Sequence, residues 1–320
     1  MKRTKWLAAL MAVVLSASLF TGCGAKEKTK VNVAALNGPT GIGMVQLMDN
    51  MDQGKADEDY SFTLAGAPDE LTGKITSGEV DIAALPTNLA ATLYQKTQGK
   101  VTLIALNTLG TMYVVEKGNT VNGIQDLNGK TIASAGQGST PQYTLDYLFK
   151  QNNVQATVEY KSEHAEVASA LLSGQNTLAV LPEPYVTNVM AKDPEVRVAV
   201  DLNEAWKQSA GGSELVMGCL VVRTEFLQEH KDAVDTFLKE YKESVDYVNN
   251  NVDQAAELVA KYEILPSAEV AKSAIPKCNI VCITGTEMKP AIEGYFQVLY
   301  EANAKSVGGN MPDDAFYYEK

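Results

Sequence analysis

The chain has 320 residues, and its 27 lysine and arginine residues are outnumbered by 39 aspartate and glutamate residues, giving a net charge of −12 at pH 7. This acidic balance argues against a nucleic-acid-binding protein, because such binding depends on lysine and arginine neutralising phosphates. It also argues against electrostatic attachment to anionic lipid. The length predicts two domains.

Residues 1–23 predict an export signal. Basic residues precede an apolar run, residues 6–20, that is too short for a membrane span. The run leads into "LFTGC", which resembles a bacterial lipobox with Cys23 as the lipidated first residue of the mature chain. We therefore expect a lipoprotein on the outer face of the bacterial cytoplasmic membrane, held by its lipid chains, with residues 24–29 as a polar tether. A plain secretory signal is the alternative.

The remaining chain contains an internal repeat. "SGEVDIAALP", residues 77–86, aligns without a gap with "SGQNTLAVLP", residues 173–182. Upstream, "KVNVAALNGPTG" from Lys30 aligns with "KTIASAGQGSTP" from Lys130. The same order at nearly the same spacing indicates a duplicated unit.

Each copy predicts strands that alternate with helices. The first copy predicts strands at 31–36, 61–65 and 80–85, with helices at 40–52 and 69–77. The second predicts strands at 131–135, 156–160 and 177–181, with helices at 141–152 and 164–173. Apolar runs bounded by glycine and proline, alternating with amphipathic helices, indicate parallel sheets covered on both faces.

Two long β-rich runs, "KVTLIALNTLGTMYVVEKG" and "SELVMGCLVVRTEF", predict strands that cross between the two domains. Further helices are predicted from Thr224 onward and at 253–262, 267–275 and 286–303. We therefore predict an α/β fold of two Rossmann-like lobes with mixed, mostly parallel sheets. Lobe 1 is expected to comprise residues 30–108 plus 220–320, and lobe 2 residues 109–219.

With these motifs, and with "GIQDLNGKTIA" and "CLVVRTEFLQEHKDAVDTFL", the chain resembles the type II periplasmic substrate-binding proteins of ABC importers. The nearest group is the nitrate, sulfonate, taurine and thiamine-precursor branch. The resemblance implies a monomer whose lobes close about a hinge on one small organic solute. It also implies an ABC permease and a cytoplasmic ATPase as partners, and neither a cofactor nor a catalytic residue.

The predicted fold also indicates where a solute lies. In open α/β sheets ligands lie beyond the carboxyl ends of the strands, where helix N-termini point unpaired N–H groups into the cleft. Ordinary helix capping is the alternative role for the polar residues there. The predicted ligand-binding residues, from four strand-to-helix turns and one crossing segment, are Asn37, Gly38, Thr40, Gly41, Thr87, Asn88, Gln137, Ser139, Thr140, Glu183, Tyr185 and Glu214.

The four turns contain no lysine or arginine, which disfavours a dianion. A monoanion remains compatible with helix N-termini and hydroxyls alone. Glu183 can hold an amine or a ring N–H, since a buried carboxylate must be paired or protonated. Its alternative role is that of an exposed acid at a helix start. With Tyr113, Tyr143 and Tyr185 available for stacking, the sequence favours a neutral or weakly cationic heteroaromatic solute.

The sequence argues against an enzyme. Gly38, Gly41 and Gly43 are spaced G-x-x-G-x-G, which differs from the dinucleotide fingerprint G-x-G-x-x-G. Two alternatives remain: a sensor or adhesin lipoprotein, and an enzyme resembling the thiamine-pyrimidine synthase of the same fold. The cysteine-rich stretch of that enzyme has no counterpart near Cys278 and Cys282, and we expect no metal site.

We also make predictions for the cysteines and for His164, which lie outside the four turns. The spacing of Cys278 and Cys282 in an extended stretch places them too far apart to bridge each other, which leaves a bridge from Cys219 to either one open. His164 is expected to be a solvent-facing or capping residue at a helix start.

Overall fold

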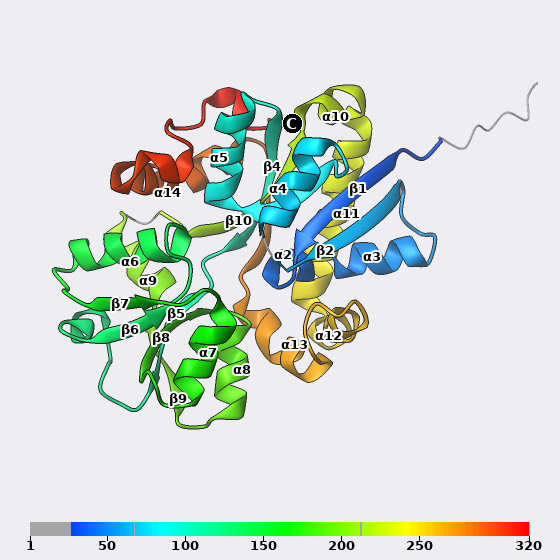
Figure 1. Ribbon diagram of the computed structural model, residues 1–320. Helices are drawn as coiled ribbons and strands as arrows, with labels where there is room; N and C mark the ends of the chain where they lie inside the picture. Colours follow the sequence, from blue (N-terminus) through cyan, green and yellow to red (C-terminus); the bar gives the residue numbers. More distant parts are fainter. Residues whose placement is uncertain (1–26, 67, 212, 320) are drawn as a thin grey trace, which may run out of the picture.

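The structure is a computed structural model that describes residues 27–319 except 67 and 212. The predicted export signal, the lipobox and Cys23 therefore lie outside the described residues. Two α/β lobes, each built on its own mixed sheet, lie side by side (Figure 1). The predicted fold class is confirmed.

Lobe 1 contains a six-stranded sheet in the order β11-β4-β10-β3-β1-β2. Within it β1, β2 and β3 are parallel, and β10 is antiparallel to both of its neighbours. Its strands are β1 (Lys30–Leu36), β2 (Asp59–Ala65), β3 (Ile82–Pro86), β4 (Val101–Leu109), β10 (Val216–Arg223) and β11 (Ile280–Ile283).

Helices cover both faces of this sheet because successive strand residues point to opposite sides. In β3, Ala83 and Leu85 belong to the core under α4, α5 and α14, while Ile82 and Ala84 belong to the core under α3, α11, α12 and α13. The helices of lobe 1 are α2 (Pro39–Ile42), α3 (Val45–Asp52), α4 (Pro68–Ser77), α5 (Thr87–Thr97), α10 (Thr224–Glu229), α11 (Lys231–Asn250), α12 (Val252–Lys261), α13 (Ala268–Ala274) and α14 (Met288–Ala302). A short 3-10 turn, η2 (Ile275–Lys277), follows α13.

Lobe 2 contains a five-stranded sheet in the order β7-β6-β8-β5-β9. Its strands are β5 (Met112–Lys117), β6 (Thr131–Ser134), β7 (Thr157–Tyr160), β8 (Leu178–Pro182) and β9 (Val196–Asp201). Its helices are η1 (Ile124–Leu127), α6 (Thr140–Gln151), α7 (His164–Leu172), α8 (Tyr185–Lys192) and α9 (Leu202–Ser209).

The order of the strands confirms the internal repeat. The series β2-β1-β3-β10 in lobe 1 matches β7-β6-β8-β5 in lobe 2, and the fourth strand is antiparallel in both. Each fourth strand directly follows the crossing from the other lobe, because β5 comes after β4 and β10 comes after β9. The duplication therefore places equivalent strand ends of the two lobes at the same boundary.

Several predicted elements differ from the structure, and the helix predicted from Thr224 onward is divided into α10 and α11. The helix predicted at 40–52 is divided into α2 and α3. Gly43 lies at the break, and a Cβ there would come within 2.9 Å of the Tyr241 hydroxyl. The break therefore lies where the chain packs against Tyr241 of α11.

The two β-rich runs do not cross between the lobes as continuous strands. The first divides into β4 and β5, and only Gly110 and Thr111 lie between them. The second forms β10, which pairs along its length with β3 and β4, so the crossing between the lobes comes before Val216, where the strand begins. Hydrogen bonding on both edges holds β10 within lobe 1.

The three described cysteines are free, so no bridge joins Cys219 to Cys278 or Cys282. Among the described helices, none combines the length and the apolar character that a membrane crossing requires.

Candidate functional site

The two crossing segments lie against each other at the lobe boundary. The Thr111 amide donates to Met217 Sδ at 3.4 Å, and Asn279 Nδ2 donates to the Gly110 carbonyl. Asn203, at the start of α9, packs onto Gly110 so closely that a Cβ at this glycine would lie 1.9 Å from Asn203 Oδ1. The crossing between β4 and β5 therefore passes through a position where only glycine fits without rearrangement.

Two of the predicted turns meet across the boundary. Thr140, at the start of α6 in lobe 2, donates through Oγ1 to Asn88 Oδ1, at the start of α5 in lobe 1, at 3.2 Å. Thr140 Oγ1 also accepts a hydrogen bond from the Tyr295 hydroxyl of α14 at 2.9 Å. Strand-end turns from opposite lobes therefore meet at Asn88 and Thr140.

The starts of α5 and α6 share an electrostatic property. Neither helix has an acidic residue in its first turn, and neither has a side-chain hydrogen bond from its N-cap residue, Pro86 or Ser139. The first turns of α2, α3, α8 and α14 likewise lack an acidic residue, whereas those of α4, α7, α9, α10, α11, α12 and α13 carry one. Because helix N-termini carry partial positive charge, these two starts favour a negatively charged group at the boundary.

Thr87 adds a polar group at the start of α5. Its side chain is fully buried, and its hydroxyl has no oxygen or nitrogen partner. Two predicted residues of the 136–140 turn in lobe 2 are placed differently from Thr87. Gln137 is exposed, and Ser139 Oγ donates to the Gly136 carbonyl within its own turn at 2.8 Å.

The turn after β1 is held by hydrogen bonds to main-chain carbonyl groups of β1 and β2. The Asn37 amide donates to the Ala65 carbonyl, and Thr40 Oγ1 donates to the Leu36 carbonyl at 3.1 Å. Gly38 has a positive φ of 118°, a conformation that favours glycine. A Cβ at Gly41 would lie 2.8 Å from the Leu36 carbonyl oxygen, so this glycine permits close approach.

Glu183 is 1 % exposed, which differs from the exposed helix-start acid considered from the sequence. Its carboxylate accepts hydrogen bonds from the Thr187 amide and the Thr187 hydroxyl, both at 3.1 Å. Burial raises the pKa of this carboxyl group, and the hydrogen bonds from Thr187 and the charge of Lys277 oppose that rise. Glu183 therefore stabilises the start of its own helix.

The remaining predicted residues lie in lobe 2 or at its edge. Tyr185 is half-buried, and its ring centroid lies 5.6 Å from that of His164. Glu214 forms an ion pair with Lys207 of α9 at 3.1 Å, so its charge is already compensated. Neither residue has a hydrogen bond to the Asn88–Thr140 pair among the described contacts.

Sequence reasoning missed the residues that the C-terminal segment brings to the boundary. Lys277 reaches Thr187 of α8, and Tyr295 and Asn303 reach Thr140 and Tyr143 of α6. The sequence offered only the apolar stripe of α14 as a signal, and such a stripe is typical of any helix that packs on a core.

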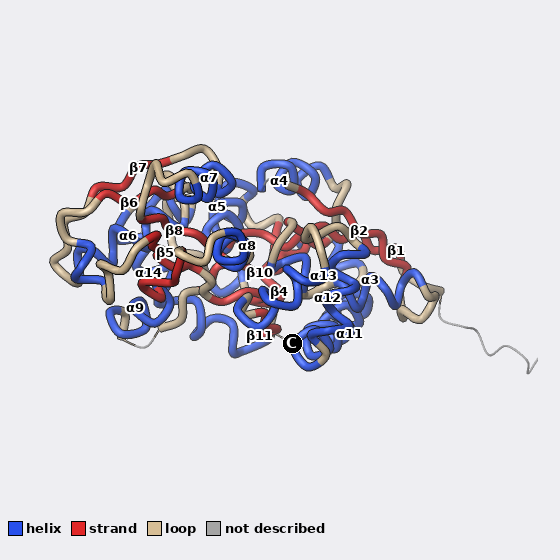
Figure 2. Tube along the Cα trace, turned by 90° about the horizontal axis from the view of Figure 1, so that it is seen from below, coloured by secondary structure: helices blue, strands red, loops and turns tan. Residues whose placement is uncertain are grey.

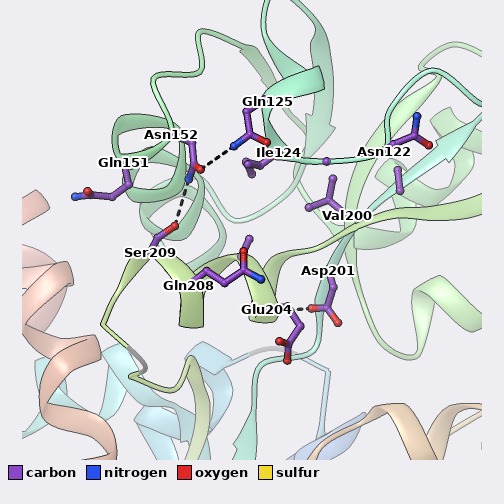
Figure 3. Close-up of a pocket in the computed structure, with 13 residues that line it drawn as sticks. Asn122, Ile124, Gln125, Gln151, Asn152, Val200, Asp201, Glu204, Gln208 and Ser209 are labelled. Carbon is purple, nitrogen blue, oxygen red and sulfur yellow. Dashed lines mark hydrogen bonds between the residues drawn. The ribbon is translucent and has the colours of Figure 1, made fainter.

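A hollow of about 570 Å³ lies elsewhere, on lobe 2 between η1, α6, β9 and α9 (Figure 3). Asn152 lies at its edge, accepting from Gln125 Nε2 and donating to Ser209 Oγ, both at 3.2 Å. A second hollow, of about 400 Å³, lies between α4 and α5 and includes Asp69. No predicted ligand-binding residue lines either hollow, so both are separate from the lobe boundary.

Comparison with known families identifies the chain. The VitK2_biosynth family model, described as menaquinone biosynthesis, matches residues 44–300. The chain belongs to the VitK2_biosynth family. A comparison with curated proteins found no match.

Solved structures resemble this VitK2_biosynth member in fold. An ABC transporter from Parabacteroides distasonis is 23% identical, with a TM-score of 0.79, and the match covers 92% of this chain and 100% of that chain. The aliphatic sulphonate-binding protein SsuA from Escherichia coli is 15% identical, with a TM-score of 0.71 and coverage of 88% and 94%. The ligand-binding component of an ABC-type import system from Staphylococcus aureus is 18% identical, with a TM-score of 0.69 and coverage of 91% and 97%.

These likenesses show that the VitK2_biosynth member has the fold of ABC-type solute-binding proteins. The branch expected from the sequence, that of nitrate, sulfonate, taurine and thiamine-precursor binding, stays a prediction. The site residues likewise stay predictions, supported by the geometry of the Asn88–Thr140 pair.

His164 of this VitK2_biosynth protein is half-buried rather than solvent-facing, and its Nδ1 is buried without a hydrogen-bond partner. Burial lowers the pKa of its imidazole to about 4. The unfolded chain has a histidine pKa of about 6.5, so it takes up this proton first as the pH falls. Stability contributed by neutral His164 is therefore fully present above about pH 6.5 and is lost as the pH falls towards 4.

We expect His164→Gln to reduce the loss of unfolding free energy between pH 6.5 and 4 by roughly 1–2 kcal/mol, a figure discounted for partial solvent exposure. Urea denaturation at several pH values measures the effect. The same substitution at the exposed His230 is the control. Parallel pH profiles for His164→Gln and the unsubstituted protein would contradict the conclusion that neutral His164 contributes to stability.

Proposed function

We propose that the protein is the extracytoplasmic solute-binding component of an ABC importer. It captures one small organic solute between its lobes by closing about the hinge, and it presents the solute to a permease. The observation that carries this proposal is the hydrogen bond between Asn88 and Thr140, which joins two acid-free helix starts from opposite lobes. Closure lets a solute select one arrangement of the lobes.

The geometry favours a small organic acid as the solute, in place of the neutral or weakly cationic heteroaromatic favoured by the sequence. Glu183 is already occupied by two hydrogen bonds from Thr187, which removes the main reason to expect a cation. The uncompensated starts of α5 and α6 suit an anionic oxygen. The names of three of the similar structures refer to sulphonate binding, which is consistent with this class.

The proposal includes export and anchoring. The apolar segment before Cys23 serves as the signal, and a lipid on Cys23 holds the mature protein at the membrane. Residues 24–29 connect the anchor to β1, which begins at Lys30. The protein acts as a monomer whose partners are a permease and its ATPase.

A second candidate follows from the family, whose description is menaquinone biosynthesis. In that case the boundary between the lobes is an active site for a small organic acid. A specific observation favours it: the Glu183 side chain is only 1 % exposed, and burial raises the pKa of its carboxyl group. A buried carboxyl group of this kind suits proton transfer.

Native mass spectrometry of freshly purified protein tests the proposal, followed by thermal-shift screening with alkylsulfonates, carboxylates, pyrimidines and amino acids. A solute present at 100 times its dissociation constant should raise the unfolding free energy by about 2.7 kcal/mol. Asn88→Ala should weaken this stabilisation, while Asn122→Ala, in the separate hollow, should leave it unchanged. No stabilisation by any class would contradict solute binding, and conversion of the solute to a product would favour the enzyme.

A further inference from the structure

Among the contacts between the described parts of the two lobes, two differ clearly in chemistry. The α14 contact consists of Tyr295 and Asn303 of lobe 1 against Thr140, Tyr143 and Trp206 of lobe 2. The Tyr295 and Trp206 rings are fully buried, with centroids 5.6 Å apart in an edge-to-face arrangement. Asn303 Nδ2 donates to the Tyr143 hydroxyl at 3.3 Å.

The α14 contact is continuous with the apolar core. Met288 and Ile292 of α14 belong to the same cluster of buried residues as Leu145 and Leu148 of α6. Figure 1 shows α14 next to α6, and the two helices are in contact. Separating the lobes here would expose large apolar side chains, each of which contributes about 1.5–3 kcal/mol when buried.

The α8 contact is polar and small. It consists of Lys277 of lobe 1 and Glu183 and Thr187 of lobe 2. Lys277 Nζ donates to Thr187 Oγ1 at 3.3 Å, and the same hydroxyl donates to Glu183 Oε1 at 3.1 Å. Figures 1 and 2 both show α13, which leads into η2, beside α8 at the lobe boundary.

Charge explains why Lys277 matters at the α8 contact. Glu183 is 1 % exposed, and a buried carboxylate is costly unless a positive charge or hydrogen bonds compensate it. Lys277 is an exposed residue whose charge acts on Glu183 from the other lobe. Separating the lobes at this place breaks the hydrogen bond between Lys277 and Thr187 and moves the Lys277 charge away from Glu183.

We propose that Lys277 is a positioning residue that holds the cleft closed at the α8 contact, so that solute enters between α8 and η2 while the α14 contact stays formed. The inference rests on the proposed solute-binding function, and it adds the side from which the cleft opens. It assigns the motion to the polar contact because that contact is the less costly one to break.

Spin-label distances in the solute-free protein test the proposal. One label pair, at Ala191→Cys and Ser273→Cys, spans α8 and α13, and a second, at Asp146→Cys and Gln297→Cys, spans α6 and α14; all four positions are exposed. Cys282→Ser, with Cys219 and Cys278 buried, provides the background for labelling.

Lys277→Ala should lower the ratio of short to long distances between α8 and α13 by about threefold or more. The distance between α6 and α14 should not change. Lys277→Arg, which retains the charge, should restore the short distance. Lys272→Ala on α13, whose lysine pairs with Asp253 within lobe 1, is the matched control and should have no effect.

Combining Lys277→Ala with Thr187→Val should open the α8 contact no further than either change alone, because both act in one chain of hydrogen bonds. Unchanged distances between α8 and α13 in Lys277→Ala would overturn the proposal, and so would equal lengthening between α6 and α14. Both readouts are made without solute, so a failure of solute binding leaves them interpretable.

Discussion

Replacing Trp206 by alanine is expected to lower the unfolding free energy by about 3–5 kcal/mol, the range for removing a large buried aromatic side chain. Trp206 is fully buried, and its ring centroid lies 4.9 Å from that of Tyr147 and 5.6 Å from that of Tyr295. Its indole Nε1 donates to Ser213 Oγ at 3.2 Å. The change removes packing within lobe 2 and across the α14 contact together.

Urea denaturation followed by circular dichroism measures this effect. Because Tyr295 loses its partner in lobe 2, we also expect the single transition to divide into two. Trp206→Phe should cost much less, since a ring remains between the two tyrosines. A loss below about 1 kcal/mol in Trp206→Ala would show that the α14 contact does not couple the lobes.

Gly110→Ala is expected to lower the unfolding free energy by about 2–3 kcal/mol, because the added Cβ would overlap Asn203. The clash involves the buried amide of Asn203, with Oδ1 at 1.9 Å and Cγ at 2.5 Å from the Cβ position. Asn203 is only 7 % exposed, so it has little room to move. Since Gly110 lies between β4 and β5, solute binding should weaken as well.

The Asn203 side chain supplies a sharp control for this prediction. Neither polar atom of its amide has a hydrogen-bond partner, so Asn203→Ala alone should be nearly neutral. In the Asn203→Ala background, Gly110→Ala should lower the unfolding free energy far less than it does alone, because the clashing side chain is absent. A double-mutant cycle measures this coupling. Additive costs would mean that Gly110 is required for another reason than space.

The sequence predicted the lobes well because the relevant signals are local. "SGEVDIAALP" and "SGQNTLAVLP" each form a helix end followed by a strand, β3 and β8, and these strands occupy equivalent places in the two sheets. Each copy contains the hydrophobic periodicity of its own strands and helices, so these elements can be recognised from the sequence alone. The sequence did not predict the break between α2 and α3, since this break depends on the approach of Gly43 to Tyr241.

The candidate site was predicted only in part. Thr140 and Asn88 were found because both follow a strand end in a duplicated unit, and the structure joins them. Glu183 was recognised as a carboxylate near the boundary, but its partner Thr187 lies on its own helix. A turn indicates which polar atoms are available, yet it does not indicate which are already satisfied.

The sequence by itself determined the two α/β lobes, their duplication and the polar residues at their strand ends, because hydrophobic period and turn chemistry are properties of short segments. Only the tertiary structure decided how the lobes meet. Tyr295 lies 155 residues from Thr140, and Lys277 lies 90 residues from Thr187. No local pattern encodes such distant contacts, since they arise when the C-terminal helices pack back on lobe 1 and bring α14 and η2 to the edge of lobe 2.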